Sequence, residues 1–414
     1  MKILAYTSPA RGHLFPLVPI LDELSRRGHS IALRTLASEV GLMTNRGFDA
    51  APIAPEIEAI QHDDYRGRTP PAKLKRAMAT FAARSELEVA DAQAAIAEQA
   101  PDAMLVDCMT WGATAVAQAW GGPWAQWFPY PLPLSSRDAP PFGPGLKPAK
   151  GLPGRFRDGL LRPLLTGTLE KATLPGLNAM RTAVGVRPFA RADDMFTCPP
   201  LLLYMTGEPF EYPRSDWPAS VRMVGPCSWD PPADPPGWLA ELDRPLILVS
   251  TSSEFQDDGR LVRTALDALR DDHVQVVATL PAAGVSVPAL ANARLESFVP
   301  HSAILEHAAC AITHGGAGAT QKALAAGVPV CVVPFGRDQL EVARRVEMAG
   351  AGTRLSAQRL SAGRLRSRVR AAIAMRDGAR RVAEGFAATG GASAGADAFE
   401  ALAGARVVAA PARG

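Results

Sequence analysis

The chain has 414 residues, 47% of them hydrophobic, which is too long for one ordinary core, so we expect two domains. Its net charge is only +3 and the basic residues are scattered, which argues against a nucleic-acid partner. The five cysteines show no CxxC pair or disulfide framework, no His or acidic cluster suggests a metal site, and no stretch approaches the ~18 apolar residues that span a bilayer. We therefore expect a cytoplasmic protein without a metal or a membrane span.

The first part of the chain alternates strands and helices. Residues 2–7 are predicted to form a buried strand, "PLVPILDELSRRG" a helix with Pro16 in its first turn and Gly28 at its stop, and "SIALRTL" the next strand. Parallel strands need such a helical crossover. A helix near 73–99, the strand "AMLVD" ending at Asp107, and a helix over 111–122 continue the pattern. This alternation predicts an open α/β sheet.

Two proline-rich segments interrupt the alternation. Residues 129–154 contain too much proline and glycine for a helix or strand, so we expect a long surface excursion. Residues 216–238 precede the strand-like "RPLILVST" and are predicted to be the interdomain linker. We therefore expect an N-terminal domain over 1–215, a C-terminal domain over 239–385, and a C-terminal helix and tail over 386–414 that packs back on the first domain.

The second half alternates cleanly, which predicts a second α/β domain and a cleft between the two. The expected strands cover 245–251, 274–280, 294–298, 310–314 and 328–333, and the expected helices cover 259–270, 302–308 and 316–326.

The stretch "CAITHGGAGATQKALAAGVPVCVVPFGRDQ", residues 310–339, is the most informative one. A strand is predicted to end at His314, and glycines at 315, 316 and 318 let the backbone approach a ligand where the next helix begins. Free N–H groups and the positive end of the helix dipole bind anions, most often phosphate, and His314 and Thr320 can add donors. The spacing is neither GxGxxG nor that of a P-loop, and a tight turn is the alternative for the glycines alone.

This stretch resembles the donor-binding signature of family 1 glycosyltransferases, most closely the bacterial branch that glycosylates natural products. The family's His-Gly-Gly-x-Gly, Ala-Leu, Gly-Val-Pro and acidic-Gln elements all stand between His314 and Gln339, and the resemblance extends to "FVP" at 298–300 and "STSS" at 250–253. It implies two Rossmann-like domains facing across a cleft (the GT-B fold), with an acceptor-binding domain over 1–215 and a nucleotide-sugar-binding domain over 239–385. It also implies a UDP- or dTDP-linked sugar as co-substrate with no other cofactor.

The resemblance also implies roles for single residues in donor binding. Phe298 would stack on the base and the Val299 backbone would read its edge. Asp338 and Gln339 would bind the sugar hydroxyls, although a helix N-cap followed by a surface glutamine is the alternative. The diphosphate would be held by His314, Gly316, Gly318, Ala319 and Thr320, near the hydroxyl-bearing Thr251 and Ser252.

One position departs from the family pattern. Eight residues after the signature histidine the family usually has a glutamate that accepts hydrogen bonds from the ribose, but this chain has Lys322. Lysine only donates hydrogen bonds, so it does not repeat that role. Either the ribose is held in another way, or Lys322 neutralises phosphate, or it is an exposed helix lysine.

The stretch "GHLFP" places Gly12 and His13 after the first strand, where the same family carries a histidine in a Gly-His-x-x-Pro setting. The carboxyl end of a strand in an open sheet faces the ligand crevice. A neutral imidazole there can take the proton of an acceptor hydroxyl, and Asp107 matches the position of the family's partner carboxylate. The alternative is that His13 packs in the loop and Asp107 caps the following helix.

Together these features predict an inverting transferase that moves a sugar from a nucleoside-diphosphate donor to a hydroxyl of an apolar natural product, as in antibiotic biosynthesis. A homodimer is compatible with the sequence. The alternatives are a nucleotide-sugar epimerase of similar fold and a non-catalytic nucleotide-sugar-binding partner. The expected apolar acceptor rests on aromatic residues that could equally be core: Trp111, Trp120, Trp124, Trp127, Phe128 and Tyr130.

Overall fold

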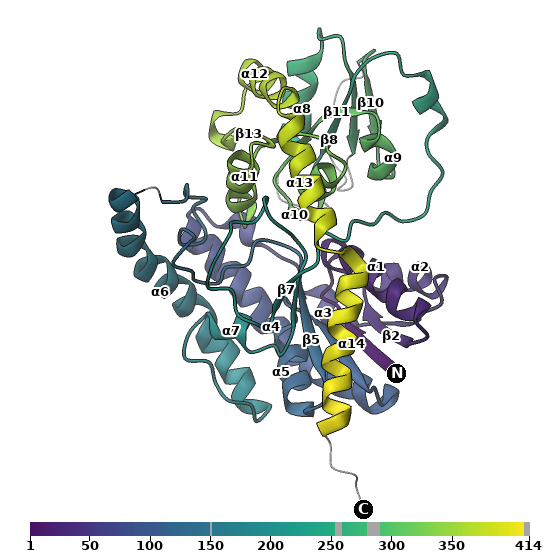
Figure 1. The fold of residues 1–414 in the computed structure, drawn as a ribbon, viewed down its shortest axis with the longest axis vertical. Coiled ribbons are helices and arrows are strands. Elements are labelled where there is room, and N and C mark those ends of the chain that lie inside the picture. The colour runs from purple at the N-terminus through teal and green to yellow at the C-terminus, as the bar shows by residue number, and fades with distance from the viewer. Residues whose placement is uncertain (150, 253–258, 280–289, 410–414) are drawn as a thin grey trace, which may run out of the picture.

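The computed structural model describes residues 1–149, 151–252, 259–279 and 290–409. Four predicted features therefore extend outside the described residues: the excursion at 150, the hydroxyl-bearing loop at 253, a strand end at 280 and the tail at 410–414. The two sheets are stacked along the long axis of the molecule, with helices around each (Figure 1). Within the described part of the chain, no helix is both long and apolar enough to cross a membrane.

The first sheet has seven parallel strands in the order β3-β2-β1-β4-β5-β6-β7. Its central strands are almost continuous apolar runs, because helices cover both faces of a parallel sheet. The strands are β1 (Lys2–Tyr6), β2 (Ser30–Thr35), β3 (Asp49–Pro52), β4 (Ala103–Asp107), β5 (Trp124–Phe128), β6 (Leu202–Tyr204) and β7 (Val221–Met223). The helices are α1 (Arg11–Arg26), α2 (Val40–Thr44), α3 (Pro55–Ala59), α4 (Pro70–Gln99), α5 (Trp111–Trp120), α6 (Gly151–Ala183) and α7 (Asp194–Thr197).

The second sheet has six parallel strands in the order β10-β9-β8-β11-β12-β13. The strands are β8 (Leu246–Ser250), β9 (Gln275–Thr279), β10 (Ala293–Glu296), β11 (Ala308–Thr313), β12 (Val330–Val332) and β13 (Gly352–Arg354). The helices are α8 (Gly259–Leu269), α9 (His301–Leu305), α10 (Ala317–Ala325), α11 (Gln339–Met348), α12 (Ala362–Ile373), α13 (Arg376–Ala388) and α14 (Gly391–Ala409).

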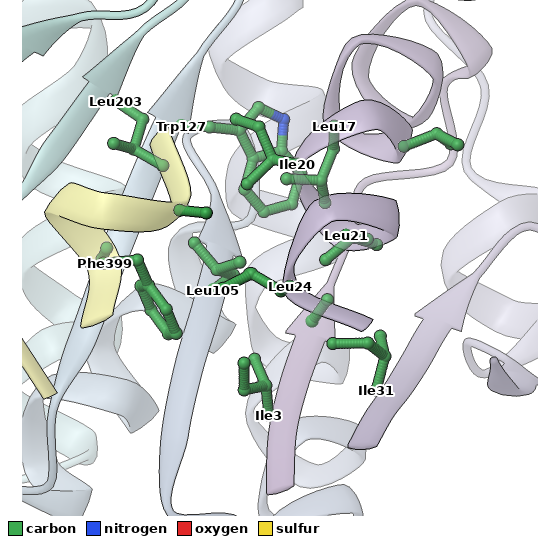
Figure 2. Close-up of a cluster of buried hydrophobic side chains, with 14 of the residues drawn as sticks. Ile3, Leu17, Ile20, Leu21, Leu24, Ile31, Leu105, Trp127, Leu203 and Phe399 are labelled. Carbon is green, nitrogen blue, oxygen red and sulfur yellow. The ribbon is translucent and has the colours of Figure 1, made fainter. Parts of the chain in front are cut away.

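The last helix, α14, leaves the second sheet and lies against α1 of the first (Figure 1). Phe399 enters the core formed by α1 and the central strands, together with Leu105 and Trp127 (Figure 2). At the edge of this contact, Arg27, the residue after α1, pairs with Glu400 of α14 at 2.7 Å. Residues at the end of the chain thus complete the core of the first domain.

The start of α1 differs from the prediction. The helix begins at Arg11, five residues before Pro16, and Ala10 is the extended residue before it. Pro16 and Pro19 lie inside this helix, where neither can donate to the carbonyl oxygen four residues earlier, and the helix continues through both. His13 therefore lies in the first turn of a helix and not in a loop.

The proline-rich excursion also differs. Residues 151–154, predicted to be irregular, form the first turn of α6. The preceding segment is irregular, as predicted, but it is not confined to the surface, since the Gly143 and Gly145 N–H groups donate to Glu341 Oε1 on α11 at 2.8 and 2.9 Å. Buried N–H groups need acceptors, and Glu341 supplies one from the second domain.

Residues 221–223, inside the segment predicted to be the linker, form the edge strand β7 of the first sheet.

A buried ion network lies close to the crossing between the sheets. Glu211, from the β6–β7 connection, accepts from the Arg345 guanidinium at 2.9 and 3.0 Å, and Arg345 also pairs with Glu341 at 3.0 Å. Because all three charges are almost fully buried, losing one partner would leave an uncompensated charge.

Candidate active site

A cavity of about 1690 Å³ lies between the two sheets, and both halves of the chain line it. In each sheet the strand order reverses once, between β1 and β4 and between β8 and β11. Ligands of open α/β sheets bind outside the carboxyl ends of the strands at such reversals. His13 follows β1, Ser250 ends β8 and His314 follows β11, and all three line the cavity.

His13 and Asp107 are in contact. His13 Nδ1 lies 2.8 Å from Asp107 Oδ1, and the ring is 14% exposed while the carboxylate is fully buried. Asp107 also accepts from the Ser8 N–H and hydroxyl at 2.9 and 2.6 Å and from the Met109 N–H at 2.9 Å. Burial opposes ionisation, but the His13 charge and these donors together lower the pKa of Asp107 below its usual value. The carboxylate is therefore held ionised beside the imidazole.

The immediate surroundings of this pair are apolar and fix the histidine. The Trp127 indole N–H donates to the His13 carbonyl oxygen at 3.1 Å, and the Tyr130 ring lies 5.7 Å from the imidazole centroid.

Donor atoms of His13, Asp107 and Cys108 lie within 4.8 Å of one another, as metal ligands would. Burial and then the Asp107 charge raise the pKa of the Cys108 thiol, which disfavours the thiolate that a metal would require.

On the opposite side, His314 and the glycines form the turn between β11 and α10. Gly315 has φ +94°, a conformation that favours glycine, and Gly316 is the residue before the first turn of α10. A Cβ at Gly316 would lie 2.5 Å from His314 Nε2, whereas a Cβ at Gly318 would have no neighbour within 4 Å. A larger residue at position 316 would therefore have to displace the His314 ring, and Gly318 borders open space in the cavity.

Two of the predicted hydroxyl donors are used inside the protein. Thr320 is fully buried, its hydroxyl lies 2.9 Å from that of Thr313, and it does not line the cavity. The expectation that this hydroxyl reaches a diphosphate is therefore not met. Thr251 lines the cavity but donates to the Thr279 carbonyl oxygen at 3.2 Å. Ser252, Ala319 and Gly12 also line the cavity, as predicted for a donor site.

Phe298 and Val299 lie at one end of the cavity. Phe298 follows β10, and its side chain is 51% exposed, so one of its faces is open to a ligand. Val299 is buried, and its backbone N–H and C=O have no hydrogen-bond partner within the described part of the chain. A flat aromatic face beside unused backbone groups is suited to binding a nucleobase.

Asp338 and Gln339 precede and begin α11, on the cavity wall. Asp338 occupies the N-cap position of α11, as the alternative expected, but its side chain makes no capping hydrogen bond. Gln339 is buried, so the expectation of a surface glutamine is wrong. Burial raises the pKa of Asp338 to about 6, and the His13 charge acts on it in the opposite direction. Gln339 Oε1 accepts from the Phe335 and Gly336 N–H groups at 2.7 and 3.0 Å, which fixes the loop before α11.

Lys322 is not an exposed helix lysine, because its side chain is only 17% exposed. Its ammonium donates to the carboxylate of Asp230 and to the carbonyl oxygen of Trp229, both in the segment predicted to be the linker. A second ion pair joins Arg337, with φ +52°, to Asp64 of the first domain at 2.9 Å. Sequence analysis missed Asp230 and Asp64, because each meets its partner only through the tertiary fold.

The aromatic residues expected to contact an acceptor are mostly core. Of the six, only Tyr130 lines the cavity. Trp127 and Phe128 lie on β5 and are buried, because both faces of the sheet are covered. Other apolar side chains line the first-domain wall: Leu74, Met78, Phe81, Leu134, Phe142 and Leu165.

Comparisons with known proteins agree with this architecture. The model of the C-terminal domain of erythromycin biosynthesis protein CIII-like proteins matches residues 263–401. The chain is 33% identical over 387 residues to 4'-demethylrebeccamycin synthase of Lentzea aerocolonigenes, covering 90% of this chain and 91% of that protein. The structure of the calicheamicin glycosyltransferase CalG4 matches with a TM-score of 0.71 and 22% identity, over 98% of both chains. Glycosyltransferase VinC in complex with dTDP matches with a TM-score of 0.69 and 23% identity, over 97% of this chain and 99% of that one.

Proposed function

The chain belongs to the nucleotide-sugar-dependent glycosyltransferases of natural-product biosynthesis, which have the GT-B fold, and from this premise we propose an inverting transfer with His13 as general base. The donor is a UDP- or dTDP-linked sugar, and the acceptor is a hydroxyl of an apolar small molecule. The contact between His13 and the buried Asp107 at the cavity is the observation that carries the proposal.

The donor binds to the second domain. The start of α10 directs free N–H groups and the positive end of the helix dipole into the cavity beside Gly318, where no side chain occupies the space. His314, at the end of β11, adds a ring nitrogen to this region. The exposed Phe298 takes the base. Asp338 and Gln339, which line the same cavity as His13, bind the sugar hydroxyls.

The base acts from the first domain. When Nδ1 carries the proton that Asp107 accepts, Nε2 is the unprotonated nitrogen and can take the acceptor's hydroxyl proton. The acceptor oxygen then bonds to the anomeric carbon while the bond to the diphosphate oxygen breaks, and the nucleoside diphosphate leaves with the electron pair. Attack opposite to the leaving group inverts the anomeric configuration. Asp107 touches neither substrate, so it is a positioning residue that stabilises the imidazolium.

Charge development in this reaction matches the distribution of groups. Negative charge grows on the leaving diphosphate, where the α10 dipole is positive, and positive charge grows on His13, where Asp107 is negative. The apolar first-domain wall, which includes Phe81 and Leu134, provides the surface for an apolar acceptor.

The test is incubation with a panel of UDP- and dTDP-sugars, with and without candidate aglycones, measuring diphosphate release and the anomeric configuration of the product by NMR. The proposal expects acceptor-dependent release and an inverted product. A retained configuration would contradict the direct displacement. Release from no donor in a broad panel would favour a protein that only binds nucleotide sugars.

A further inference from the structure

Lys322 and Asp230 form an ion pair on the cavity wall that joins three separate parts of the chain. The Lys322 ammonium, on α10, donates to Asp230 Oδ1 and, at 2.7 Å, to the Trp229 carbonyl oxygen. Asp230 Oδ2 accepts from the Ser302 N–H at 2.9 Å, near the start of α9. Both charged side chains line the cavity and are 14–17% exposed. The pair is therefore fixed in place and still accessible to a ligand.

The pair has unused hydrogen-bonding capacity. An ammonium carries three donors and a carboxylate about four acceptor positions. Within the described part of the chain Lys322 uses two donors and Asp230 accepts two hydrogen bonds, so one donor and about two acceptor positions remain. The neighbouring imidazole of His301 is neutral at pH 7, because burial and then the Lys322 charge lower its pKa to about 4.

This arrangement is suited to hydroxyl groups and not to phosphate. The charges of Lys322 and Asp230 offset each other, so no net positive charge remains to attract an anion. A single hydroxyl can donate to the carboxylate and accept from the ammonium, and the vicinal diol of UDP can do so through two oxygens. The interpretation of Lys322 as a phosphate-neutralising residue is therefore disfavoured.

The pair lies where a ribose would be. Lys322 follows Gly318 by four residues on α10, about 6 Å along the helix, and both line the cavity. In a nucleotide the ribose is bonded directly to the α-phosphate, so a diphosphate at the start of α10 brings the ribose within this reach. Phe298, the proposed base-stacking residue, lies only four residues before Ser302 in the chain, which anchors Asp230.

We infer that Asp230 accepts a hydrogen bond from a ribose hydroxyl of the bound nucleotide. Lys322 positions the carboxylate and donates to that hydroxyl oxygen or, in a nucleotide with both hydroxyls, to the neighbouring one. The inference rests on the proposed function, since it requires a nucleotide in this cavity. Asp230, from the segment between the sheets, would then belong to the donor site. Its carboxylate would replace the one that the family usually has at the position of Lys322.

The test is isothermal titration of the full chain with UDP and with 2',3'-dideoxyuridine diphosphate, and with dTDP and 2',3'-dideoxythymidine diphosphate. The comparison is made in whichever of the two series, uridine or thymidine, binds more tightly. We expect the hydroxylated nucleotide to bind about 10- to 100-fold more tightly than its dideoxy counterpart, the range for hydrogen bonds to charged groups. Asp230→Asn should remove most of this difference while changing the affinity for the dideoxy nucleotide less than about twofold.

Two further variants keep the test decisive. Lys322→Gln retains a donor for the Trp229 carbonyl and should partly reduce the affinity ratio between the hydroxylated and the dideoxy nucleotide. This variant provides the test if Asp230→Asn does not fold. Asp234→Asn, at an exposed position in the same segment, should change nothing. Equal losses for both nucleotides in the Asp230 and Lys322 variants would show a purely structural pair and overturn the inference, as would a wild type without discrimination. If the wild type binds none of the four nucleotides, the proposed function fails as well.

Discussion

Replacing Asp107 by asparagine is the most informative change at the base, because the side chain keeps its shape and loses its charge. Asp107 Oδ1 accepts from His13 and from the Met109 N–H, and Oδ2 accepts from the Ser8 N–H and hydroxyl. An amide NH₂ placed at either position faces a backbone donor. If it lies at the Oδ1 position, it also forces His13 Nδ1 to accept, which moves the ring proton to Nε2 and removes the base.

The magnitude follows from these contacts. A hydrogen bond to a charged group contributes about 1.5–3 kcal/mol, so kcat should fall about 10- to 150-fold, and further where the tautomer changes. One unsatisfied buried N–H should also lower the free energy of unfolding by about 1–3 kcal/mol. The donor affinity should change little, because Asp107 lies on the first domain.

The assay is initial-rate transfer, with nucleotide affinity and urea unfolding measured in parallel. Ser8→Ala is the matched control, because it removes one hydrogen bond to Asp107 but leaves the His13 contact, and it should cost less than about fivefold in kcat. If folded Asp107→Asn retains transfer within about threefold of the wild type, the carboxylate only caps the start of the following helix, and the reasoning is refuted.

Three further predictions concern charge and close approach. The folded state raises the pKa of Asp338 to about 6, so stability falls as pH rises from about 4 through 6, and Asp338→Asn should raise Tm above pH 6 but not at pH 4. A Tm difference that does not depend on pH would contradict this. Burial raises the pKa of Glu88 to about 8, so ionising this carboxyl destabilises the folded protein as pH rises. The Tm of Glu88→Gln should therefore exceed the wild-type Tm by an amount that grows up to about pH 8, with transfer unchanged. A difference in Tm that stops growing by pH 5 would contradict this. Gly318→Ala should leave Tm unchanged, since its Cβ meets nothing, but weaken UDP or dTDP binding about 10-fold or more; unchanged binding in titrations would remove the diphosphate from this helix start.

The site residues that were predicted from the sequence lie at or after the carboxyl ends of strands. The prediction of His13 and Asp107 as partners used the family resemblance together with their places after the first predicted strand and at the end of the strand "AMLVD". The strands β1 and β4 are neighbours in parallel register. The glycine-rich turn after β11 was likewise visible, because His314 and the glycines lie within one short stretch. Local pattern places such residues at the edge of a sheet, and the family resemblance assigned their roles.

Other features depended on tertiary packing. Asp230 and Lys322 are 92 residues apart, and no local pattern connects them. The inward rotation of Thr320 depends on which side of α10 packs against β11, which periodicity in nine residues does not determine. The helix α6 begins with glycine and proline and contains two internal prolines, so its sequence has the composition of a loop although it packs against α4.

The central claim is that His13 on the first domain is the base for a donor held by the second. The most direct measurement compares His13→Ala with the wild type in sugar transfer and in nucleotide-diphosphate affinity, each followed on folded protein. The account predicts that transfer falls at least 100-fold while the UDP or dTDP affinity stays within about twofold, since general-base catalysis contributes about 10²–10⁴. Transfer that survives the change would contradict it.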